Sequence, residues 1–409
     1  MGKKWYVATA AAVTAAVVGV AAGGVYYNRQ PHAAPGETIA APAARIHPAT
    51  PSAPADPELA AKLSKLASDP RLGHLVGQVS EGGNVVWEQD PTQPVRPAST
   101  TKLLTAAAAL LTLGEEDRLT TQLLDAGNGT VVLKAGGDVM LDDAALAKLA
   151  AGTPKDTKKV VVDTSIWPDD AFNSTWKKDD IGGGYIAPIQ PVMVHGARIG
   201  GTEGELPRSS TPALDAGRAL ASRIGGAAVE LGTGQGNVLA ESKSPQLADR
   251  LRDMMYESDN VMAEALGREV AVARHQAADF GGATQAVRDT FAEHGFDTTG
   301  LTLKDTSGLS EDNRIPPALL NSVLANEDLH GLLASLPIAA AEGTLASRFQ
   351  HSPGAGWVRA KTGTLTGTSG LAGTVTSRTG HVYTFALVSN DSEISAAREG
   401  LDAMASALR

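Results

Sequence analysis

The first motif that could carry out chemistry is Ser99–Lys102, which places a hydroxyl and an amine three positions apart. Pro97 ends any earlier helix, and the run Lys102–Leu113 that follows is apolar on all sides, which predicts a buried helix. At this spacing the two side chains lie on one helix face, and the N–H groups of the helix N-terminus can stabilise an oxyanion. Because burial favours the neutral amine, the motif predicts Lys102 as the base that activates a Ser99 nucleophile.

Two further motifs could belong to the same site. Ser258–Asn260 (Ser-Asp-Asn) lies at a predicted helix boundary, where helix capping is the alternative interpretation. Lys361–Gly363 (Lys-Thr-Gly) opens a run rich in Thr and Gly before a predicted hairpin, where a solvated edge strand is the alternative. Each motif alone is weak, but coincidence is a poor explanation for all three in this order. Together they predict one catalytic set, which consists of Ser99, Lys102, Ser258, Asn260 and Lys361.

Other candidates for chemistry are weaker. A second Ser-x-x-Lys motif, Ser174–Lys177, lies in a polar stretch where its lysine would be solvated, so we interpret it as coincidental. His195 is interpreted as an ordinary turn or core histidine. Cysteine is absent, which excludes disulfides, thiolate metal sites and cysteine nucleophiles. The sequence also lacks the Gly-x-Ser-x-Gly and His-Glu-x-x-His motifs, so a serine enzyme of this kind would use lysine as its base.

Class A β-lactamases and penicillin-binding proteins share this trio of motifs. The chain most resembles the D-alanyl-D-alanine carboxypeptidase/endopeptidase family of the penicillin-binding protein 4 type, the S13 serine peptidases. Ser99 and Ser258 are much further apart than the same motifs of class A β-lactamases, and the resemblance extends from about Leu75 to the C-terminus. Further segments resemble the family, namely Gly137–Asp138, Lys304–Ser310, Glu342–Leu345 and Val358–Leu365.

The resemblance implies a mechanism that needs neither a metal nor an organic cofactor. Ser99 would attack the carbonyl between two D-alanines of a peptidoglycan stem peptide, and Lys102 would accept its proton. Ser258 would help to pass that proton to the leaving amine, while Lys361 supplies positive potential. Asn260 would hold the amide on the acyl side of the substrate.

The resemblance also implies how the substrate is bound. Lys361 and Thr362 would receive the terminal carboxylate, and the backbone N–H groups of Ser99 and Thr364 would form the oxyanion hole. β-Lactam antibiotics would be covalent inhibitors that acylate the same serine. The implied substrate-binding residues are Thr362, Gly363 and Thr364.

The implied fold is α+β, of the penicillin-binding-protein/β-lactamase-like transpeptidase type, with an antiparallel sheet flanked by helices and an inserted β-rich domain. Sequence patterns agree with it: hairpins are predicted at 75–87 and 371–388, and helices at 58–67 and 395–408. Short apolar runs broken by Gly, Asp and Pro fill the middle of the chain. We therefore predict a peptidase domain formed by residues 58–119 and 241–409, with an inserted domain at 120–240.

The N-terminus predicts export. Two lysines in Met1–Lys4 precede Val7–Tyr27, which has no charged residue and is long enough to span a bilayer. Residues 1–28 are thus predicted to be a signal peptide or membrane anchor, and the Pro- and Ala-rich residues 29–57 a linker. The protein would act outside the cytoplasmic membrane, in the cell envelope, and touch the membrane only through this segment. Its net charge of −10 and lack of a basic patch argue against nucleic acid as a partner.

Two alternative functions stay open from the sequence. A secreted serine β-lactamase would share the trio but release the drug quickly, and the wide motif spacing argues against it. A non-catalytic cell-wall-binding protein of the same fold would need neither Ser99 nor Lys102, yet both are present. The sequence does not separate carboxypeptidase from endopeptidase activity, because the two differ only in how the leaving side is accommodated.

Overall fold

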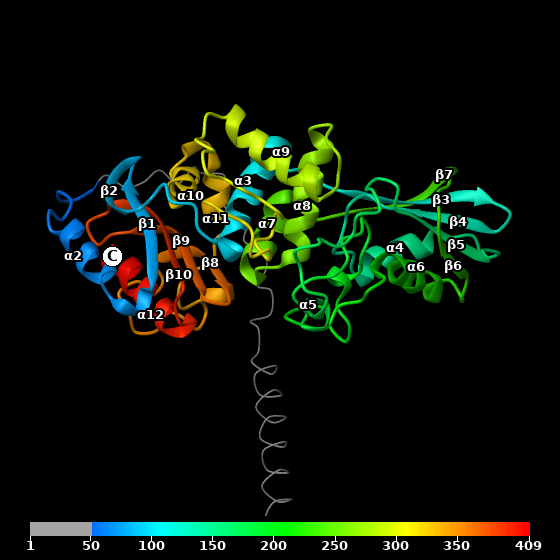
Figure 1. Cartoon of the computed structure of the whole chain (residues 1–409). Coiled ribbons are helices and arrows are strands. Elements are labelled where there is room, and N and C mark those ends of the chain that lie inside the picture. The colour runs from blue at the N-terminus through cyan, green and yellow to red at the C-terminus, as the bar shows by residue number, and fades with distance from the viewer. Residues whose placement is uncertain (1–50) are drawn as a thin grey trace, which may run out of the picture. The chain divides into compact units, whose positions relative to one another are not determined.

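The computed structural model describes residues 51–409, which form one compact unit. The predicted signal peptide or anchor and most of the predicted linker lie outside the described residues. Within residues 51–409, no helix is both long and apolar enough to cross a membrane. Two five-stranded sheets organise the unit (Figure 1).

The first sheet is antiparallel throughout and has the order β2-β1-β10-β9-β8. β1 pairs with β10, so an early strand lies beside the last one in the chain. The hairpins β1–β2 and β9–β10 form where alternating apolar residues predicted them. β8 is an edge strand and carries the Lys361–Gly363 motif. The strands are β1 His74–Glu81, β2 Asn84–Gln89, β8 Val358–Leu365, β9 Thr368–Thr376 and β10 Val382–Asn390.

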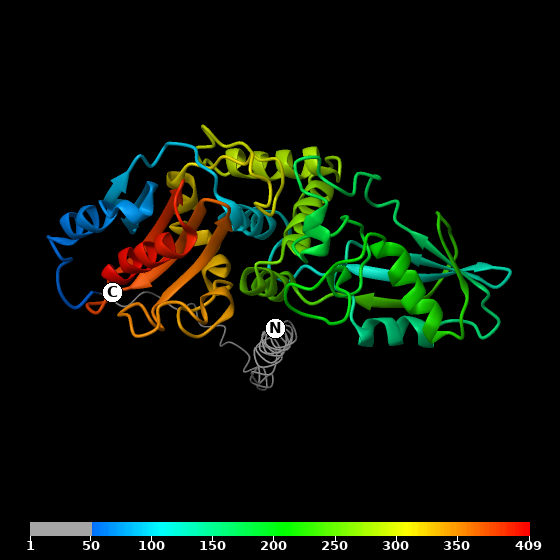
Figure 2. The ribbon, with the colours of Figure 1, turned by 60° about the horizontal axis from the view of Figure 1, so that its bottom comes forward.

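Helices cover both faces of this sheet (Figure 2). On one face α2 and α12 share a core with the strands that includes Leu63, Phe385 and Leu401. On the other face α3 is central, and every residue of Lys102–Ala109 is buried, which explains why the sequence is apolar all round. The helices are α2 Leu59–Ala67, α3 Lys102–Leu113, α7 Leu247–Glu257, α8 Asn260–Ala273, α9 Phe280–Glu293, α10 Pro317–Leu324, α11 His330–Ala334 and α12 Ile394–Ala407.

We call residues 120–243 the insert region. Its sheet has the order β6-β5-β4-β3-β7, in which β3 is antiparallel to both neighbours and β4, β5 and β6 are parallel. Parallel neighbours need crossover connections, and α4 and α6, which lie in those connections, share a core with the sheet that includes Leu133, Leu146 and Leu220. The elements are β3 Thr120–Gly127, β4 Thr130–Lys134, α4 Asp143–Ala151, β5 Lys159–Asp163, α5 Asp179–Gly182, α6 Pro212–Arg223, β6 Ala228–Leu231 and β7 Asn237–Lys243.

Part of the insert region packs against the peptidase helices instead. Trp167, Trp176, Ile186 and Met193 are buried in the same core as α3 and α8. Trp176 also meets Phe280 of α9 edge to face, with ring centroids 5.0 Å apart. The predicted α+β fold is confirmed. The insert region was predicted to be β-rich, but it also contains the helices α4, α5 and α6. The boundaries at 120 and 240 stay a prediction.

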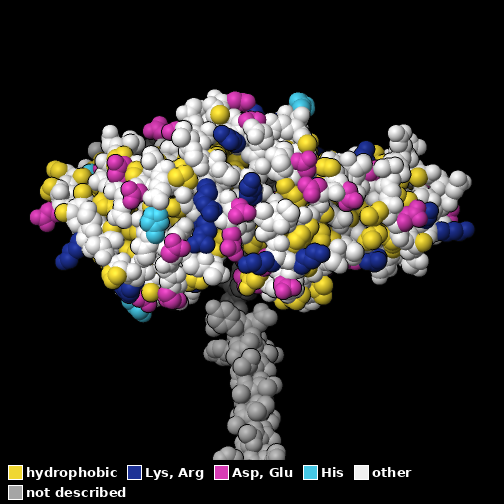
Figure 3. Space-filling view, viewed as in Figure 1, with side chains coloured by type: hydrophobic (Ala, Val, Ile, Leu, Met, Phe, Trp, Pro, Cys, Tyr) yellow, Lys and Arg dark blue, Asp and Glu magenta, His cyan; other side chains and the backbone are white. Residues whose placement is uncertain are grey.

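Charged side chains of both signs are mixed on one face of the molecule. On the face in Figure 3, Lys and Arg side chains lie among Asp and Glu side chains, without a large area of one sign. Several form exposed ion pairs, such as Lys159–Glu230 and Lys177–Glu311. Exposed pairs of this kind contribute little to stability.

Candidate active site

Ser99 and Lys102 lie where a 3₁₀ turn, Ala98–Thr101, leads into α3. Lys102 is fully buried, and its Nζ donates hydrogen bonds to three oxygens. These are Ser99 Oγ at 3.0 Å, Asn260 Oδ1 at 2.6 Å and the Ser307 carbonyl at 2.8 Å. The predicted nucleophile and base are therefore in direct contact, at the start of the predicted apolar helix.

Burial lowers the pKa of Lys102 to about 8, although the charges of Asp305, Asp259 and Glu264 act in the opposite direction. Burial also lowers the pKa of Lys361 well below its ordinary value, and the charge of Lys102 lowers it further. Both amines thus lose their protons more readily than free lysine. For Lys102 the main cause is removal from water, which is the cause that the apolar helix predicts.

The Ser258–Asn260 motif connects α7 to α8. Ser258 adopts a left-handed backbone conformation (φ 55°, ψ 34°), and its Oγ lies 2.8 Å from Lys361 Nζ. Asp259 is the N-cap of α8, because its side chain accepts a hydrogen bond from Met262 N. The capping interpretation therefore applies to Asp259 and leaves the side chains on either side of it to contact the two lysines.

Lys361–Gly363 lies on the edge strand β8, but its lysine is not solvated. Lys361 is fully buried and also donates to the Thr362 carbonyl, so the interpretation as a solvated edge is wrong. At Gly363 a Cβ would come within 2.7 Å of the Pro97 carbonyl oxygen, so glycine lets β8 approach the turn that carries Ser99. The next residue, Thr364, accepts a hydrogen bond from Arg398 at 2.8 Å.

Two buried acidic residues, Asp305 and Glu264, hold the loop that contacts Lys102. Asp305 accepts four hydrogen bonds, from Gly308 N, Ser310 N, Asn313 Nδ2 and Trp176 Nε1. Glu264 accepts from the backbone N–H groups of Thr306 and Ser307. The two carboxyls hold the loop so that the Ser307 carbonyl faces Lys102. The Lys304–Ser310 segment is recognisable in the sequence only as a family resemblance, and Glu264, which has no motif of its own, was not predicted.

The two minor candidates lie elsewhere. Lys177 is exposed and pairs with Glu311, as expected for a coincidental Ser-x-x-Lys motif. His195 begins a short 3₁₀ turn, His195–Ala197, in the insert region. Within residues 51–409, no group of three or more His, Asp and Glu side chains is arranged to hold a metal ion.

Comparison with known proteins decides the family. Residues 59–223 and 202–409 match the D-Ala-D-Ala carboxypeptidase 3 (S13) family. The chain belongs to this family. The predicted family and enzyme class are thus confirmed: the S13 protein described here is a serine-type D-Ala-D-Ala carboxypeptidase.

Two relatives of this S13 protein align over most of their length. Carboxypeptidase DacB of Mycolicibacterium smegmatis is 40% identical over 99% of this chain and 96% of the relative. Carboxypeptidase Rv3627c of Mycobacterium tuberculosis is 40% identical over 88% of this chain and 85% of the relative. Penicillin binding protein 4 (dacB) from Haemophilus influenzae has a similar fold, with a TM-score of 0.71 and 23% identity over 84% of this chain and 99% of that chain.

Proposed function

We propose that this peptidase cleaves the terminal D-Ala-D-Ala bond of peptidoglycan stem peptides and that Ser99 is the residue it acylates. The observation that carries the proposal is the contact of Lys102 Nζ with Ser99 Oγ at 3.0 Å in a buried site. A neutral amine has two N–H groups and one lone pair. Asn260 Oδ1 and the Ser307 carbonyl can only accept hydrogen bonds, so they take the two N–H groups. The lone pair is left for the one partner with a proton to give, Ser99.

Acylation then follows from this geometry. Ser99 Oγ bonds to the carbonyl carbon of the penultimate D-Ala, and its proton moves to Lys102 Nζ. The bond from that carbon to the terminal D-Ala nitrogen breaks, and this nitrogen needs a proton. The proton that Lys102 has taken supplies it by way of Ser258 Oγ, which accepts a hydrogen bond from Lys361 Nζ at 2.8 Å, so that Lys102 is neutral again when the acyl-enzyme has formed. Water afterwards attacks the ester, releases the acyl group and restores the Ser99 hydroxyl, so that one water is consumed per turnover.

The proposed carboxylate site uses the β8 motif. Lys361 offers a buried amine, and Thr362 offers a hydroxyl that already lies 3.0 Å from Thr344 Oγ1. A substrate carboxylate beside Lys361 would raise the lowered pKa of this amine and so favour the charged form that binds it. We propose Thr362, Gly363 and Thr364 as the substrate-binding segment, with the N–H groups of Ser99 and Thr364 as the oxyanion hole.

We also propose that the protein is exported and works in the cell envelope. Support comes from the uncharged segment Val7–Tyr27 behind two lysines and from relatives named carboxypeptidases of the DacB type. Membrane contact would be confined to that segment. A penicillin binding protein 4 from Haemophilus influenzae has been crystallised with a β-lactam, which supports covalent inhibition of the present enzyme by the same drug class.

Intact mass after incubation with a penicillin tests the proposal, with Ser99→Ala as the control. We expect a stable adduct of one penicillin per chain on the wild type and none on the variant. Disappearance of the drug without an adduct would indicate a β-lactamase, and an unchanged drug without an adduct would indicate a non-catalytic protein. Digests of uncross-linked and cross-linked peptidoglycan then separate carboxypeptidase from endopeptidase activity.

A further inference from the structure

The Ser258–Asn260 motif is held from the insert region by a buried charge cluster. Asp259 Oδ2 forms ion pairs with Arg198 Nη2 at 2.6 Å and with Arg208 Nη2 at 2.8 Å. The Asp259 side chain is 1% exposed, and each arginine side chain is 3% exposed. We call these three residues the arginine clamp. It joins the central residue of a proposed catalytic motif to a distant segment of the chain.

The two arginines are themselves fixed in place. Backbone carbonyls accept hydrogen bonds from Nε and Nη1 of both arginines, which limits the positions that Asp259 can adopt. At Gly196, where φ is +62°, a Cβ would come within 2.7 Å of Arg208 Nη1, so glycine is what lets this arginine approach. The carbonyls are those of His195 and Gly204 for Arg198, and of Gly184 and Gly196 for Arg208.

A second contact from the insert region reaches the same motif. Asn260 Nδ2 donates to the Tyr185 carbonyl at 2.9 Å, while its Oδ1 accepts from Lys102 Nζ. The insert region thus binds two of the three residues in the motif. The position of the third, Ser258, is then determined by its neighbours, because only two residues lie between α7 and α8.

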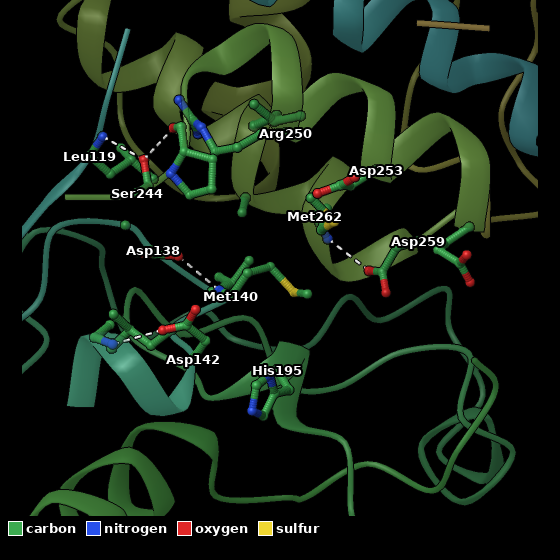
Figure 4. Close-up of a pocket in the computed structure, with 18 of the residues that line it drawn as sticks. Leu119, Asp138, Met140, Asp142, His195, Ser244, Arg250, Asp253, Asp259 and Met262 are labelled. Carbon is green, nitrogen blue, oxygen red and sulfur yellow. Dashed lines mark hydrogen bonds between the residues drawn. The ribbon is translucent and has the colours of Figure 1, made fainter. Parts of the chain in front are cut away.

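Side-chain packing does not hold Asp259 from every side. A cavity of about 540 Å³ lies between α7, α8 and loops of the insert region, and Asp259 and Arg198 are among the residues that line it. Figure 4 shows Asp259 at one end of this cavity, with Asp138, Asp142 and His195 on the wall opposite α7 and α8. On the side that faces the cavity, Asp259 has few packing contacts. The ion pairs with Arg198 and Arg208 therefore fix its position.

Helix capping alone does not account for this arrangement. The cap uses Asp259 Oδ1, which accepts from Met262 N at 3.0 Å, whereas both ion pairs use Oδ2. Burying two arginines against one carboxylate removes three charges from water, which is costly. The left-handed backbone at Ser258 adds to this cost, since side chains disfavour this conformation. Such costs are typical of sites where geometry is functional.

We propose that Arg198 and Arg208 are positioning residues for acylation. They hold Asp259 so that Ser258 Oγ reaches Lys361 Nζ and Asn260 Oδ1 reaches Lys102 Nζ. The inference rests on the proposed function and deepens it, because it gives the insert region a part in the acylation step. The arginines act through Asp259 and are not catalytic residues.

Arg198→Met and Arg208→Met test the clamp when stoichiometry and rate are measured separately by time-resolved intact mass with a penicillin. We expect each variant to bind one penicillin per chain in the end, but with an acylation rate constant lowered at least about tenfold, as for other losses of positioning. A purely structural role would instead lower the fraction that acylates and leave the rate constant of the folded fraction unchanged. Wild-type rate constants in both variants overturn the inference.

Arg250→Met is the matched control. Arg250 is also buried and pairs with Glu269 at 2.7 Å, but this pair joins α7 to α8 away from the motif. We expect a lower thermal midpoint with an unchanged acylation rate constant. If neither methionine variant folds, Arg198→Lys decides, because it keeps the charge but not the fork to two carbonyls. A reduced rate constant supports the inference and a wild-type value overturns it.

Failure of the proposed function would look different from failure of the clamp. A wild-type protein that forms no adduct removes the proposed function and the inference with it. If the wild-type protein is acylated and the clamp variants are acylated equally fast, the inference is wrong but the proposed function stands.

Discussion

Lys102 must lose its own proton before it can accept one from Ser99, so its pKa governs the pH dependence of acylation. Burial brings this pKa down to about 8, against the raising effect of three nearby carboxylates. We expect the acylation rate constant to rise about tenfold per pH unit below that value and to level off above it. Penicillin acylation followed from about pH 6 to about pH 9 checks this. A rate constant that does not change with pH would assign the base to another group.

Lys102→Ala provides the second test at this residue. Without the amine Ser99 loses the hydrogen-bonded partner that takes its proton, so we expect acylation to fall by roughly 10³-fold, within the range for general-base catalysis. Thermal unfolding should still show a folded protein, because the apolar residues of α3 that follow Lys102 keep their place in the core. A variant that acylates at nearly the wild-type rate would contradict the role given to Lys102.

Glu264 is a buried carboxyl that is linked to Lys102 through Ser307: it accepts a hydrogen bond from Ser307 N, and the Ser307 carbonyl accepts one from Lys102. Burial, and then the charge of Asp305, raise its pKa to about 7. The folded chain therefore binds more protons than the unfolded chain between about pH 4.5 and pH 7. It follows that this group makes the free energy of unfolding fall as pH rises through that window. We expect Glu264→Gln to remove its share of the slope, up to about 1.4 kcal/mol per pH unit.

Denaturant unfolding of the wild type and Glu264→Gln at both ends of this window measures the difference. Gln keeps an oxygen that can accept hydrogen bonds from Thr306 N and Ser307 N, so it is a close match in shape. Equal slopes in the two proteins would mean that Glu264 titrates in the folded chain as it does in the unfolded one.

At the scale of elements, the approach of β8 to the Ser99 turn depends on one missing side chain. A Cβ at Gly363 would meet the Pro97 carbonyl oxygen at 2.7 Å and Thr100 N at 3.2 Å. We expect Gly363→Ala to push β8 away from the turn, to lower stability by about 1–3 kcal/mol and to slow acylation. The control is Gly182→Ala, because nothing lies within 4 Å of a Cβ there. Equal acylation by both variants would contradict the prediction.

Elements whose patterns are local could be predicted from the sequence. The bounds of α3 agree with the predicted apolar run, and both hairpins of the first sheet follow from alternation around turn residues. The three motifs were recognisable because each is short and their order is distinctive. Their mutual contacts depend on tertiary structure. The resemblance to a family put Asn260 and Lys102 in one predicted catalytic set, but the hydrogen bond between them was not predicted.

Residues that act through burial were not predictable in the same way. Arg198 and Arg208 lie in a turn-rich stretch where an arginine is usually solvated, and only the folded chain buries them against Asp259. Asp305 likewise gains its importance from four donors that converge on it. The edge position of β8 suggested a solvated lysine, whereas helices around the site bury Lys361.

Considered as a whole, residues 51–409 should unfold together. The insert region supplies Trp167, Trp176, Ile186 and Met193 to the core that contains α3 and α8, so removing one part exposes the other. We expect one calorimetric transition whose van't Hoff and calorimetric enthalpies agree. Two separate transitions would show that the insert region is an autonomous domain and would weaken its link to the peptidase helices.

The pairing of β1 with β10 determines when the enzyme can first exist. A chain is made from its N-terminus, so β1 stays without this partner until β10, the last strand, has been synthesised. β8, with the lysine that contacts Ser258, joins the same sheet only through β9. Ser99 is thus synthesised early, whereas Lys361 of β8 is synthesised late. A nascent chain that carries Ser99 but not yet β8 lacks the lysine that contacts Ser258, so its site is incomplete.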